Sequence, residues 1–379
     1  MRALQRKTIV CVIGTRPEAI KMAPLIRALR AAPWARCRVV CTGQHRDLVD
    51  PILGFFQIKP DFVLDTMKAG QPLAELTERL MGSLKGTLAV IRPELTLAQG
   101  DTASVLAAAL VSFSQKIPFG HVEAGLRTGN LEAPFPEEAN RIIVSHLADV
   151  HFAPTLTARA NLLREGIRPE AIHVTGNTVI DALLDAARAD KPIGVPLDDT
   201  KQLVLVTAHR RETIGEPLRR ICQAVAALHD RLADVEFLWP LHPNPGIGPV
   251  VREILSGSPR VHLCEPLGYG PFVAAMKRAS LILTDSGGIQ EEAPALGKPV
   301  LVLRSASERP EAVSAGSALL VGHDPIRIIK ETCRIMGRPA EARRFSPLSS
   351  PFGDGRASLR IAAAIAALPG FARGGRVAG

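Results

Sequence analysis

"TIVCVIGTRPEAIK", residues 8–21, is the stretch that decides the fold class. Its first seven residues form an apolar, largely β-branched run that ends at Gly14, and a helical pattern begins shortly after it. Such a run is typical of a strand buried on both faces, and a helix directly behind it completes a βα unit. The basic N-terminus resembles that of a signal peptide, but no small-residue cleavage site follows, so we interpret the run as the first strand.

The same alternation of short apolar runs and longer helical patterns continues through most of the chain. A first series of expected strands comprises residues 8–14, 37–43, 95–101, 117–124 and 149–155. A second series begins with "AIHVTGN" (171–177) and ends with "KPVLVLR" (298–304). This alternation predicts an α/β protein whose parallel sheets are covered by helices on both faces.

Two such series predict two Rossmann-like domains that face a cleft, because 379 residues exceed what one ordinary core accommodates. We expect the first domain over residues 1–170 and the second over residues 171–355. Residues 356–379 are expected to form a C-terminal helix that packs back on the first domain and ends in a frayed tail. In doubly wound sheets, ligands bind at the carboxyl ends of the strands.

Composition narrows the class of protein. Hydrophobic residues make up 46% of the chain, yet no apolar run reaches the roughly 18–20 residues of a membrane span. Six dispersed cysteines without a CxxC pair favour free thiols in a reducing cytoplasm, and no HExxH motif or Cys/His cluster predicts a metal site. The net charge of +9 fits anionic partners, but aromatic residues at 4% offer little stacking surface for nucleic acid.

Two strand exits carry groups suited to a phosphate. Arg16 and Lys21 open the helix after the first strand, where free N–H groups and the helix dipole attract anions. In "LTDSGGIQEE", Ser286, Gly287 and Gly288 stand between a strand and a helix. Adjacent glycines allow a phosphate to approach the backbone, and Glu292, one turn inside, can accept the hydroxyls of a ribose. The alternative for both segments is an ordinary helix start with solvated charges.

Carboxylates gather at two further strand exits. The segment "HVEAGLRTGNLEAPFPEEANR" (121–141) places Glu123 directly behind an apolar run and Glu137 soon after it, while Asp101 closes the strand before. Carboxylates that share a partly desolvated cleft can hold different protonation states and act as acid and base. Arg127, Arg141 and Lys21 can balance their charge, and the alternative is ion pairing and helix capping. His209 also ends an apolar run, whereas we interpret His121 as a packed residue.

At these residues the chain resembles the non-hydrolysing UDP-N-acetylglucosamine 2-epimerases. The matching motifs follow the family's order from about Thr8 to Val321: "GTRPEAIKMAPL", "TGQHRDL", "QGDTAS", "HVEAGLRTGN", "PFPEEANR", "HLADVHFAPT", "GNTVIDAL", "HRRE", "HPNP", "SGGIQEEAPALGKPVLVLR" and "ERPEAV". The resemblance implies a glycosyltransferase-B-like fold with the active site between two domains, in a homodimer. It also implies reversible elimination of UDP from UDP-GlcNAc and its re-addition to give UDP-ManNAc, for cell-surface polysaccharide precursors, without a cofactor.

The resemblance also assigns roles to residues. Asp101, Glu123 and Glu137 match the family's functionally important carboxylates, expected to share the proton transfers, and His209 is expected to help hold the UDP leaving group. The other expected substrate contacts are Arg16, Lys21, the phosphate-binding turn Ser286-Gly287-Gly288, the ribose-binding Glu292, Arg309, and Phe272 near the uracil. Some relatives bind a second UDP-GlcNAc as an allosteric activator, and the matching residues are Gln44, Arg46, Arg210 and His242.

Several positions depart from the family's usual pattern. They are Ser305-Ala306-Ser307 before "ERPE", Glu132-Ala133 after "RTGN", Thr213 and Gly268. None is among the proposed catalytic groups, and they leave room for a modified sugar, such as a UDP-2,3-diacetamido uronic acid. The rival hypotheses are a UDP-sugar glycosyltransferase of the same fold, a hydrolysing epimerase and a UDP-sugar sensor. A nucleic-acid-binding role rests on charge alone.

Overall fold

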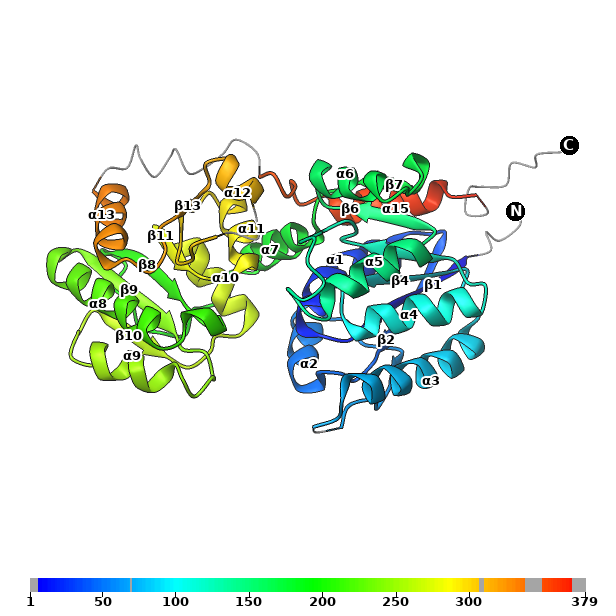
Figure 1. The fold of residues 1–379 in the computed structure, drawn as a ribbon, viewed down its shortest axis with the longest axis horizontal. Helices are drawn as coiled ribbons and strands as arrows, with labels where there is room; N and C mark the ends of the chain where they lie inside the picture. Colours follow the sequence, from blue (N-terminus) through cyan, green and yellow to red (C-terminus); the bar gives the residue numbers. More distant parts are fainter. Residues whose placement is uncertain (1–5, 69, 307–309, 338–349, 370–379) are drawn as a thin grey trace, which may run out of the picture. The chain divides into compact units, whose positions relative to one another are not determined.

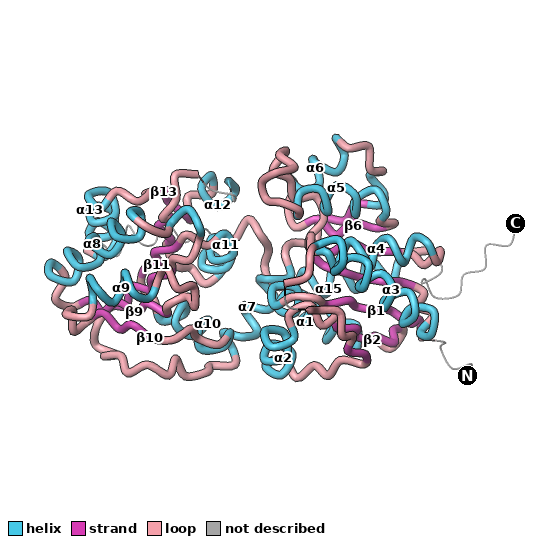
Figure 2. Tube along the Cα trace, turned by 60° about the horizontal axis from the view of Figure 1, so that its bottom comes forward, coloured by secondary structure: helices cyan, strands magenta, loops and turns pink. Residues whose placement is uncertain are grey.

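The computed structural model describes residues 6–68, 70–306, 310–337 and 350–369. The chain divides into two compact units, one formed by residues 1–182 with 352–379 and the other by residues 183–351, so the division falls within helix α7 (Thr178–Arg188). Each unit is built on its own parallel sheet with helices packed on it (Figures 1 and 2). The predicted α/β class with two Rossmann-like domains is therefore confirmed.

The first unit holds a sheet whose described strands follow the order β3-β2-β1-β4-β5-β6-β7. These strands are β1 (Lys7–Ile13), β2 (Ala35–Cys41), β3 (Phe62–Val63), β4 (Leu95–Gln99), β5 (Phe119–Val122), β6 (Val150–Ala153) and β7 (Ile172–Val174). Because β1 pairs with β4, the strand order reverses between them. Doubly wound sheets bind ligands at this switch point, so the loops after β1 and β4 are placed for function.

Helices cover both faces of this sheet. They are α1 (Arg16–Ala31), α2 (Arg46–Phe55), α3 (Leu73–Ile91), α4 (Ala103–Ser114), α5 (Glu137–Leu147), α6 (Leu156–Arg164), the short 3₁₀ helix η1 (Pro169–Ala171) and α15 (Ala357–Ala367). Val10 and Val12 of β1 pack with α3 and α4 on one face of the sheet. Ile9, Cys11 and Ile13 are equally buried and point to the other face. Burial on both faces explains the unbroken apolar run.

Two features of this unit involve chain segments that are far apart in sequence. Strand β7 pairs with β6, so it belongs to the first sheet, whereas "AIHVTGN" had been expected to begin the second series. That prediction was wrong because an apolar run does not show which neighbour its strand pairs with. Helix α15 packs against α1, and Asp181 of α7 accepts the N–H groups of Ala357 and Ser358 at 3.1 and 2.8 Å.

The second unit repeats the architecture, with the described strands in the order β10-β9-β8-β11-β12-β13. These strands are β8 (Gln202–Thr207), β9 (Val235–Pro240), β10 (Val261–Cys264), β11 (Leu281–Thr284), β12 (Val300–Val302) and β13 (Ala318–Leu320). The helices are η2 (Arg211–Thr213), α8 (Glu216–Arg231), α9 (Gly248–Leu255), α10 (Tyr269–Arg278), α11 (Gly287–Ala295), α12 (Pro310–Ser314) and α13 (Pro325–Met336). Here the order reverses between β8 and β11.

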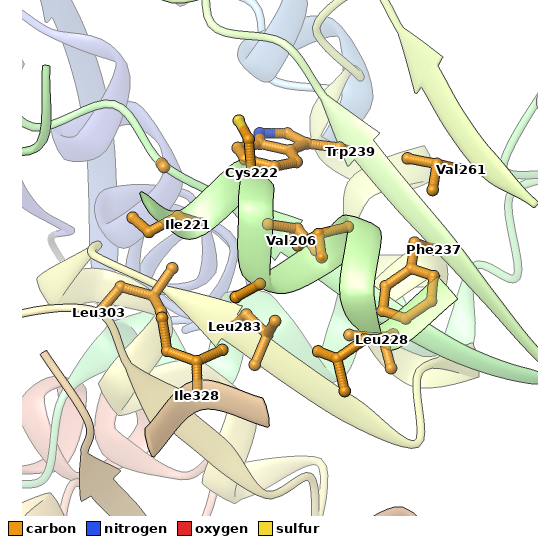
Figure 3. Close-up of a cluster of buried hydrophobic side chains, with 14 of the residues drawn as sticks. Val206, Ile221, Cys222, Leu228, Phe237, Trp239, Val261, Leu283, Leu303 and Ile328 are labelled. Carbon is orange, nitrogen blue, oxygen red and sulfur yellow. The ribbon is translucent and has the colours of Figure 1, made fainter. Parts of the chain in front are cut away.

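A dense hydrophobic core supports that switch point. Figure 3 shows Ile221 and Leu228 of α8 against Val206 of β8 and Leu283 of β11, with Ile328 of α13 in the same cluster. All of these side chains are almost completely buried. Interiors packed to this degree resist displacement, so the loops that follow β8 and β11 start from a rigid base.

Candidate active site

Glu123 is the most constrained carboxylate of the first unit. It follows β5 with a φ of 65°, a value that is uncommon for a residue other than glycine, and it is only 7% exposed. Lys21 Nζ donates to its Oε1 and Oε2 at 2.7 and 2.8 Å, and Asn177 Nδ2 donates to Oε1 at 2.9 Å. The side-chain amide of Gln99 donates to Oε2. Strained backbone of this kind persists only where the surroundings enforce it, and it concentrates at functional sites.

Asp101 stands at the exit of the neighbouring strand β4. The guanidinium of Arg141 on α5 converges on one of its oxygens, with Nε and Nη2 at 2.8 and 2.7 Å from Oδ2. Asn140 Nδ2 donates to the Asp101 carbonyl at 2.7 Å, so α5 holds both the side chain and the backbone of this residue. Burial lowers the pKa of Arg141, but the ion pairs with Asp101 and Glu138 outweigh it and leave that pKa raised.

The two adjacent glutamates at the start of α5 differ in their surroundings. Glu138 is completely buried and accepts the N–H groups of Thr128 and Gly129, both at 2.9 Å, and Nη1 of Arg141 at 2.9 Å. Burial raises its pKa, but these donors outweigh burial and the pKa ends below its ordinary value. Glu137 is half-buried, and no other described residue forms a hydrogen bond or ion pair with its carboxylate. Glu138 therefore orders the loop, and Glu137 is the member of the pair available for a ligand.

The predicted charge balance holds for two of the three cations. Lys21 pairs with Glu123 and Arg141 pairs with Asp101. Arg127 instead pairs with Glu165 of the α6 end, with Nε 2.6 Å from Oε1, so its expected role beside the carboxylates was wrong. The prediction failed because Glu165 lies outside the segment that the motif covers and is brought in only by the packing of α6.

His121 is a packed residue, as predicted. It is 1% exposed, its Nε2 lies 2.7 Å from the Gly100 carbonyl oxygen, and burial lowers its pKa to about 4. His151 stands opposite it on β6, and burial lowers the pKa of that residue to about 3. Both rings are therefore uncharged at neutral pH.

The loop after β1 brings a carboxylate that sequence reasoning did not single out. Glu18 in the first turn of α1 is 2% exposed, and burial raises its pKa to about 7. The pattern Thr15-x-x-Glu18 is a capping-box signature and is the signal in the sequence that marks this carboxylate. Arg16, the neighbouring candidate, is half-buried and forms no ion pair with a described residue.

In the second unit, Asp285 organises the switch point. It is completely buried after β11, and its Oδ2 accepts the N–H groups of His209 and Arg210 at 2.8 and 2.9 Å and the Thr213 hydroxyl at 2.8 Å. His209 Nδ1 lies 3.2 Å from Asp285 Oδ1, and the His209 ring stacks on that of His242 with centroids 5.5 Å apart. Burial lowers the pKa of His209 despite Asp285. The contact between Nδ1 and Oδ1 is within ion-pair range but is not a hydrogen bond, so Asp285 fixes the backbone of His209 and leaves Nε2 of the imidazole for a ligand.

The Ser-Gly-Gly turn begins α11 in the predicted way. Ser286 is the residue before the helix, and its hydroxyl does not cap the helix. A Cβ placed on Gly288 would meet only Ser286 Oγ, at 3.9 Å, so space is open beside this backbone. The first N–H groups of a helix have no partner within the helix, and together with the helix dipole they suit a phosphate. Glu292 lies half-buried in the same helix, Phe272 is half-buried on α10, and Arg309 lies outside the described residues.

A cavity of about 380 Å³ lies beside the start of α2 in the first unit, lined by residues 43–48, Leu64, Asp65 and Met67. Its wall includes Gln44, whose Oε1 accepts the Ser104 hydroxyl at 2.8 Å, and Arg46. Within the described parts of the chain, no cluster of three His, Cys, Asp or Glu side chains is arranged to hold a metal ion. None of the described helices combines the length and apolar character of a membrane span.

Comparison with known proteins places this arrangement in a family. The model of the family described as UDP-N-acetylglucosamine 2-epimerase matches residues 27–366. The chain is 48% identical to UDP-N-acetylglucosamine 2-epimerase of Escherichia coli K12, over 94% of this chain and 98% of that protein. It is 44% identical to the protein of the same name from Bacillus subtilis, over 94% of each chain.

Solved structures agree with this placement. The structure of UDP-GlcNAc 2-epimerase from Neisseria meningitidis bound to UDP-GlcNAc superimposes with a TM-score of 0.86 at 43% identity, covering 94% of this chain and 98% of that one. The glycotransferase of kitacinnamycin shares the fold at 16% identity, with a TM-score of 0.65 over 95% of this chain and 99% of that one. The glycosyltransferase-B-like fold and the isomerase class implied by the motifs are thereby confirmed. The chain belongs to the UDP-N-acetylglucosamine 2-epimerase family.

Proposed function

We propose that the protein interconverts UDP-GlcNAc and UDP-ManNAc, by elimination and re-addition of UDP. In the forward direction the C2–H bond and the C1–O bond to the diphosphate break, and the C1–C2 double bond of 2-acetamidoglucal forms. The proton goes to a carboxylate and the electron pair of the C1–O bond leaves with UDP. UDP then adds back while C2 is protonated on its opposite face.

The observation that carries this proposal is Glu123. A carboxylate that is buried, held at a positive φ and fixed by one lysine and two amides is oriented for a single geometry. Proton transfer at carbon requires such orientation, since the base must meet one C–H bond in line. The proposal needs no redox cofactor, because the intermediate is an alkene.

Asp101, Glu123 and Glu137 are proposed to share the proton transfers. Their surroundings differ: Glu123 faces Lys21, Asp101 receives the fork of Arg141, and Glu137 has no described partner. Carboxylates in different environments can take different roles as acid and base. The reaction requires this, because a proton leaves C2 from one face of the sugar and returns to the opposite face. Which of the three is the base in the forward direction stays open.

The second unit is proposed to bind the UDP portion. The turn at Ser286, Gly287 and Gly288 supplies N–H donors for the diphosphate, Glu292 takes the ribose hydroxyls, and Phe272 packs near the uracil. His209, whose backbone N–H donates to Asp285, supports the leaving diphosphate through Nε2. Arg16, Lys21 and Arg309 complete the proposed set of substrate contacts.

The experiment that tests the function is incubation of the protein with UDP-GlcNAc in D₂O, with no cofactor or acceptor, followed by proton NMR. We expect UDP-ManNAc to appear with deuterium at C2. Free ManNAc with UDP would indicate the hydrolysing reaction instead. No change while UDP still binds would contradict the proposed substrate and favour the diacetamido uronic acid nucleotide or an acceptor-dependent transfer.

A second UDP-GlcNAc is proposed to act as an effector in the cavity beside α2. Its volume of about 380 Å³ falls in the range of small-molecule sites. Arg46 offers its wall one cation for a phosphate, beside the carboxylates of Asp47 and Asp65. Gln44 hydrogen-bonds Ser104, which follows Asp101 closely in the chain, so occupancy of the cavity has a short route to the carboxylates. Replacement of Arg46 by alanine is expected to remove any sigmoidal dependence of the rate on UDP-GlcNAc.

The protein is also proposed to form a homodimer through α3. Glu78 and Lys85 are seven residues apart on this helix, so they lie almost in line on one exposed side of it. Glu75, Glu78 and Lys85 are exposed on α3 and form no ion pair with a described residue. If two copies of α3 lie antiparallel, Glu78 of each approaches Lys85 of the other, so the face is complementary to itself. A cytoplasmic location, which the free cysteines favour, is likewise proposed.

A further inference from the structure

Glu18 joins the two loops that carry candidate site residues in the first unit. The loop after β1, Gly14 and Thr15, leads into Arg16 at the start of α1 and forms with it the Arg16 turn, and the loop after β4 contains Asp101 and Thr102. Glu18 Oε2 accepts the N–H groups of Gly14 at 2.5 Å and Thr15 at 3.2 Å. Its Oε1 accepts the Thr102 hydroxyl at 2.6 Å. One carboxylate therefore bonds to both loops at the point where the strand order reverses.

These contacts go beyond ordinary helix capping. In a capping box the glutamate reaches back to the backbone at the start of its own helix, as Oε2 does here. The bond from Oε1 to Thr102 instead crosses to a loop 84 residues away in the chain. A surface cap leaves its second oxygen in water, whereas Glu18 is 2% exposed and has its second oxygen in this cross-loop bond.

The packing around Glu18 leaves the two loops little freedom. A Cβ on Gly14 would stand 2.2 Å from Ser104 Oγ and 3.0 Å from Thr42 Oγ1, so the strand exits meet at a separation that only glycine permits. Ser104 and Thr42 are hydrogen-bonded to each other at 2.9 Å. Because the backbones at the ends of β1 and β4 are this close, we expect the two loops to stay at the same separation when the Glu18 bonds are lost. The direction in which the loop tips point is expected to change.

Glu18 itself does not reach the proposed reacting groups. Thr102 is the neighbour of Asp101 in the chain, and Thr15 is the neighbour of Arg16. A shift of about 1 Å in a positioned group is enough to lower a rate by about a hundredfold. A change at Glu18 can therefore act on turnover through Asp101 without removing any group that contacts the substrate.

We propose that Glu18 is a positioning residue of the epimerisation, which sets the direction of Asp101 through its hydrogen bond with Thr102 and holds the Arg16 turn through Gly14 and Thr15. This inference rests on the proposed function of Asp101. The inference predicts that turnover requires the hydrogen-bond geometry at residue 18 and does not require the negative charge of Glu18. A glutamine can accept the two N–H groups through its oxygen and donate to the Thr102 oxygen through its amide.

The test measures kcat, KM and the affinity for UDP. It compares the full-length wild-type protein with variants at both ends of the Glu18–Thr102 hydrogen bond. Glu18→Ala and Thr102→Val are each expected to lower kcat at least tenfold, and the double variant to lower it no further than Glu18→Ala alone. Thr102→Val is expected to leave the Kd for UDP within about twofold, because the Arg16 turn keeps its two bonds. Glu18→Gln and Thr102→Ser are expected to retain kcat within about threefold.

Matched controls separate positioning from folding. Thr77→Val on α3 removes an exposed hydroxyl that bonds only its own helix, and Glu170→Ala removes an exposed glutamate. A full stoichiometry of UDP binding shows that a variant is folded. Three outcomes would overturn the inference and leave the proposed function standing. They are an unchanged kcat in Thr102→Val, losses of kcat that multiply in the double variant, and a Glu18→Gln variant as slow as Glu18→Ala. Failure of the wild-type protein to epimerise UDP-GlcNAc would instead overturn the proposed function.

Discussion

Lys21 Nζ lies 2.7 and 2.8 Å from the two carboxylate oxygens of Glu123, and the pair joins helix α1 to the end of strand β5. The side chains are 17% and 4% exposed, so water screens the pair weakly. Two amides also donate to the carboxylate, and these bonds help to compensate the cost of its burial. The same contacts that make Glu123 tolerable inside the protein also fix its direction.

Glu123→Gln is expected to lower kcat by roughly 10²–10⁴-fold, the range that a positioned acid–base group contributes. Glutamine keeps the shape of the side chain but cannot take up a proton. Calorimetry is expected to show UDP affinity within about threefold of wild type, because UDP lacks the reacting C2 carbon. Turnover that stays unchanged would remove Glu123 from the catalytic set.

Lys21→Met is expected to destabilise the protein by about 3 kcal/mol, because it leaves a buried carboxylate without its cation. Adding Glu123→Gln to this variant is expected to restore most of the loss, since no uncompensated charge remains. Urea unfolding of the two variants measures both effects. The control is Arg188→Met at an exposed pair with Asp185, where a change within about 0.5 kcal/mol is expected. Equal destabilisation at both sites would contradict the special role of the buried pair.

Ser286→Ala is expected to weaken UDP binding about tenfold without lowering thermal stability, because a hydrogen bond to a charged group is lost and the hydroxyl does not cap α11. Glu292→Ala is expected to weaken binding by a similar factor through the ribose. Calorimetry with UDP measures both, and Ser256→Ala at an exposed position is the control. If either variant bound UDP as tightly as wild type, the proposed place of the nucleotide would be wrong.

The stability of the protein relative to Glu18→Gln is expected to fall as pH rises through neutrality. Burial raises the pKa of Glu18 from 4.5 to about 7 in the folded state, so the folded state binds this proton more tightly than the unfolded state. The stabilisation is therefore complete below about pH 4.5 and is lost as pH rises through 7, a change of roughly 3 kcal/mol.

Glutamine does not titrate and shows no such loss. The melting temperature of Glu18→Gln minus that of wild type is thus expected to be larger at pH 8.5 than at pH 5. Glu170→Gln, at an exposed position, serves as the control and is expected to show a constant difference. A pH-independent difference for Glu18→Gln would mean that Glu18 does not titrate in the neutral range.

Lys85→Glu is expected to shift the protein from dimer to monomer, because an antiparallel pair of α3 helices would then bring like charges together. Light scattering during gel filtration measures the mass at several concentrations. The charge-restoring variant Lys85→Glu/Glu78→Lys is expected to recover the dimer. A monomeric wild-type protein, or a dimer indifferent to Lys85→Glu, would contradict the proposed face.

Sequence patterns were sufficient where a property depends on neighbours in the chain. The apolar run before Gly14 predicted β1, because burial on both faces of a parallel sheet leaves no polar position in the strand. The Ser-Gly-Gly turn predicted the start of α11, since its backbone conformation depends on those residues themselves. Glu123 could be singled out because a charged residue directly after an apolar strand is unusual, whichever neighbouring strand it pairs with.

Partners distant in the chain were beyond such reasoning. The sequence did not show that Arg127 binds Glu165, that Glu138 and not Glu137 is buried, or that Glu18 reaches Thr102. It also placed β7 in the wrong series. Each of these pairings depends on the order of the strands in the sheet and on the angle at which a helix packs. The same local sequence pattern is compatible with several such packings, so the pattern alone does not identify the partner.

By itself the sequence determined the βα order, the strand exits that carry polar groups and, through ordered motifs, the family. Only the tertiary structure decided how those polar groups pair. Local conformation follows from hydrophobic period and turn chemistry, which neighbouring residues supply. The pairing of a buried carboxylate with a lysine 102 residues away follows from sheet topology, because burial makes an unpaired charge too costly and the fold alone decides which cation is within reach.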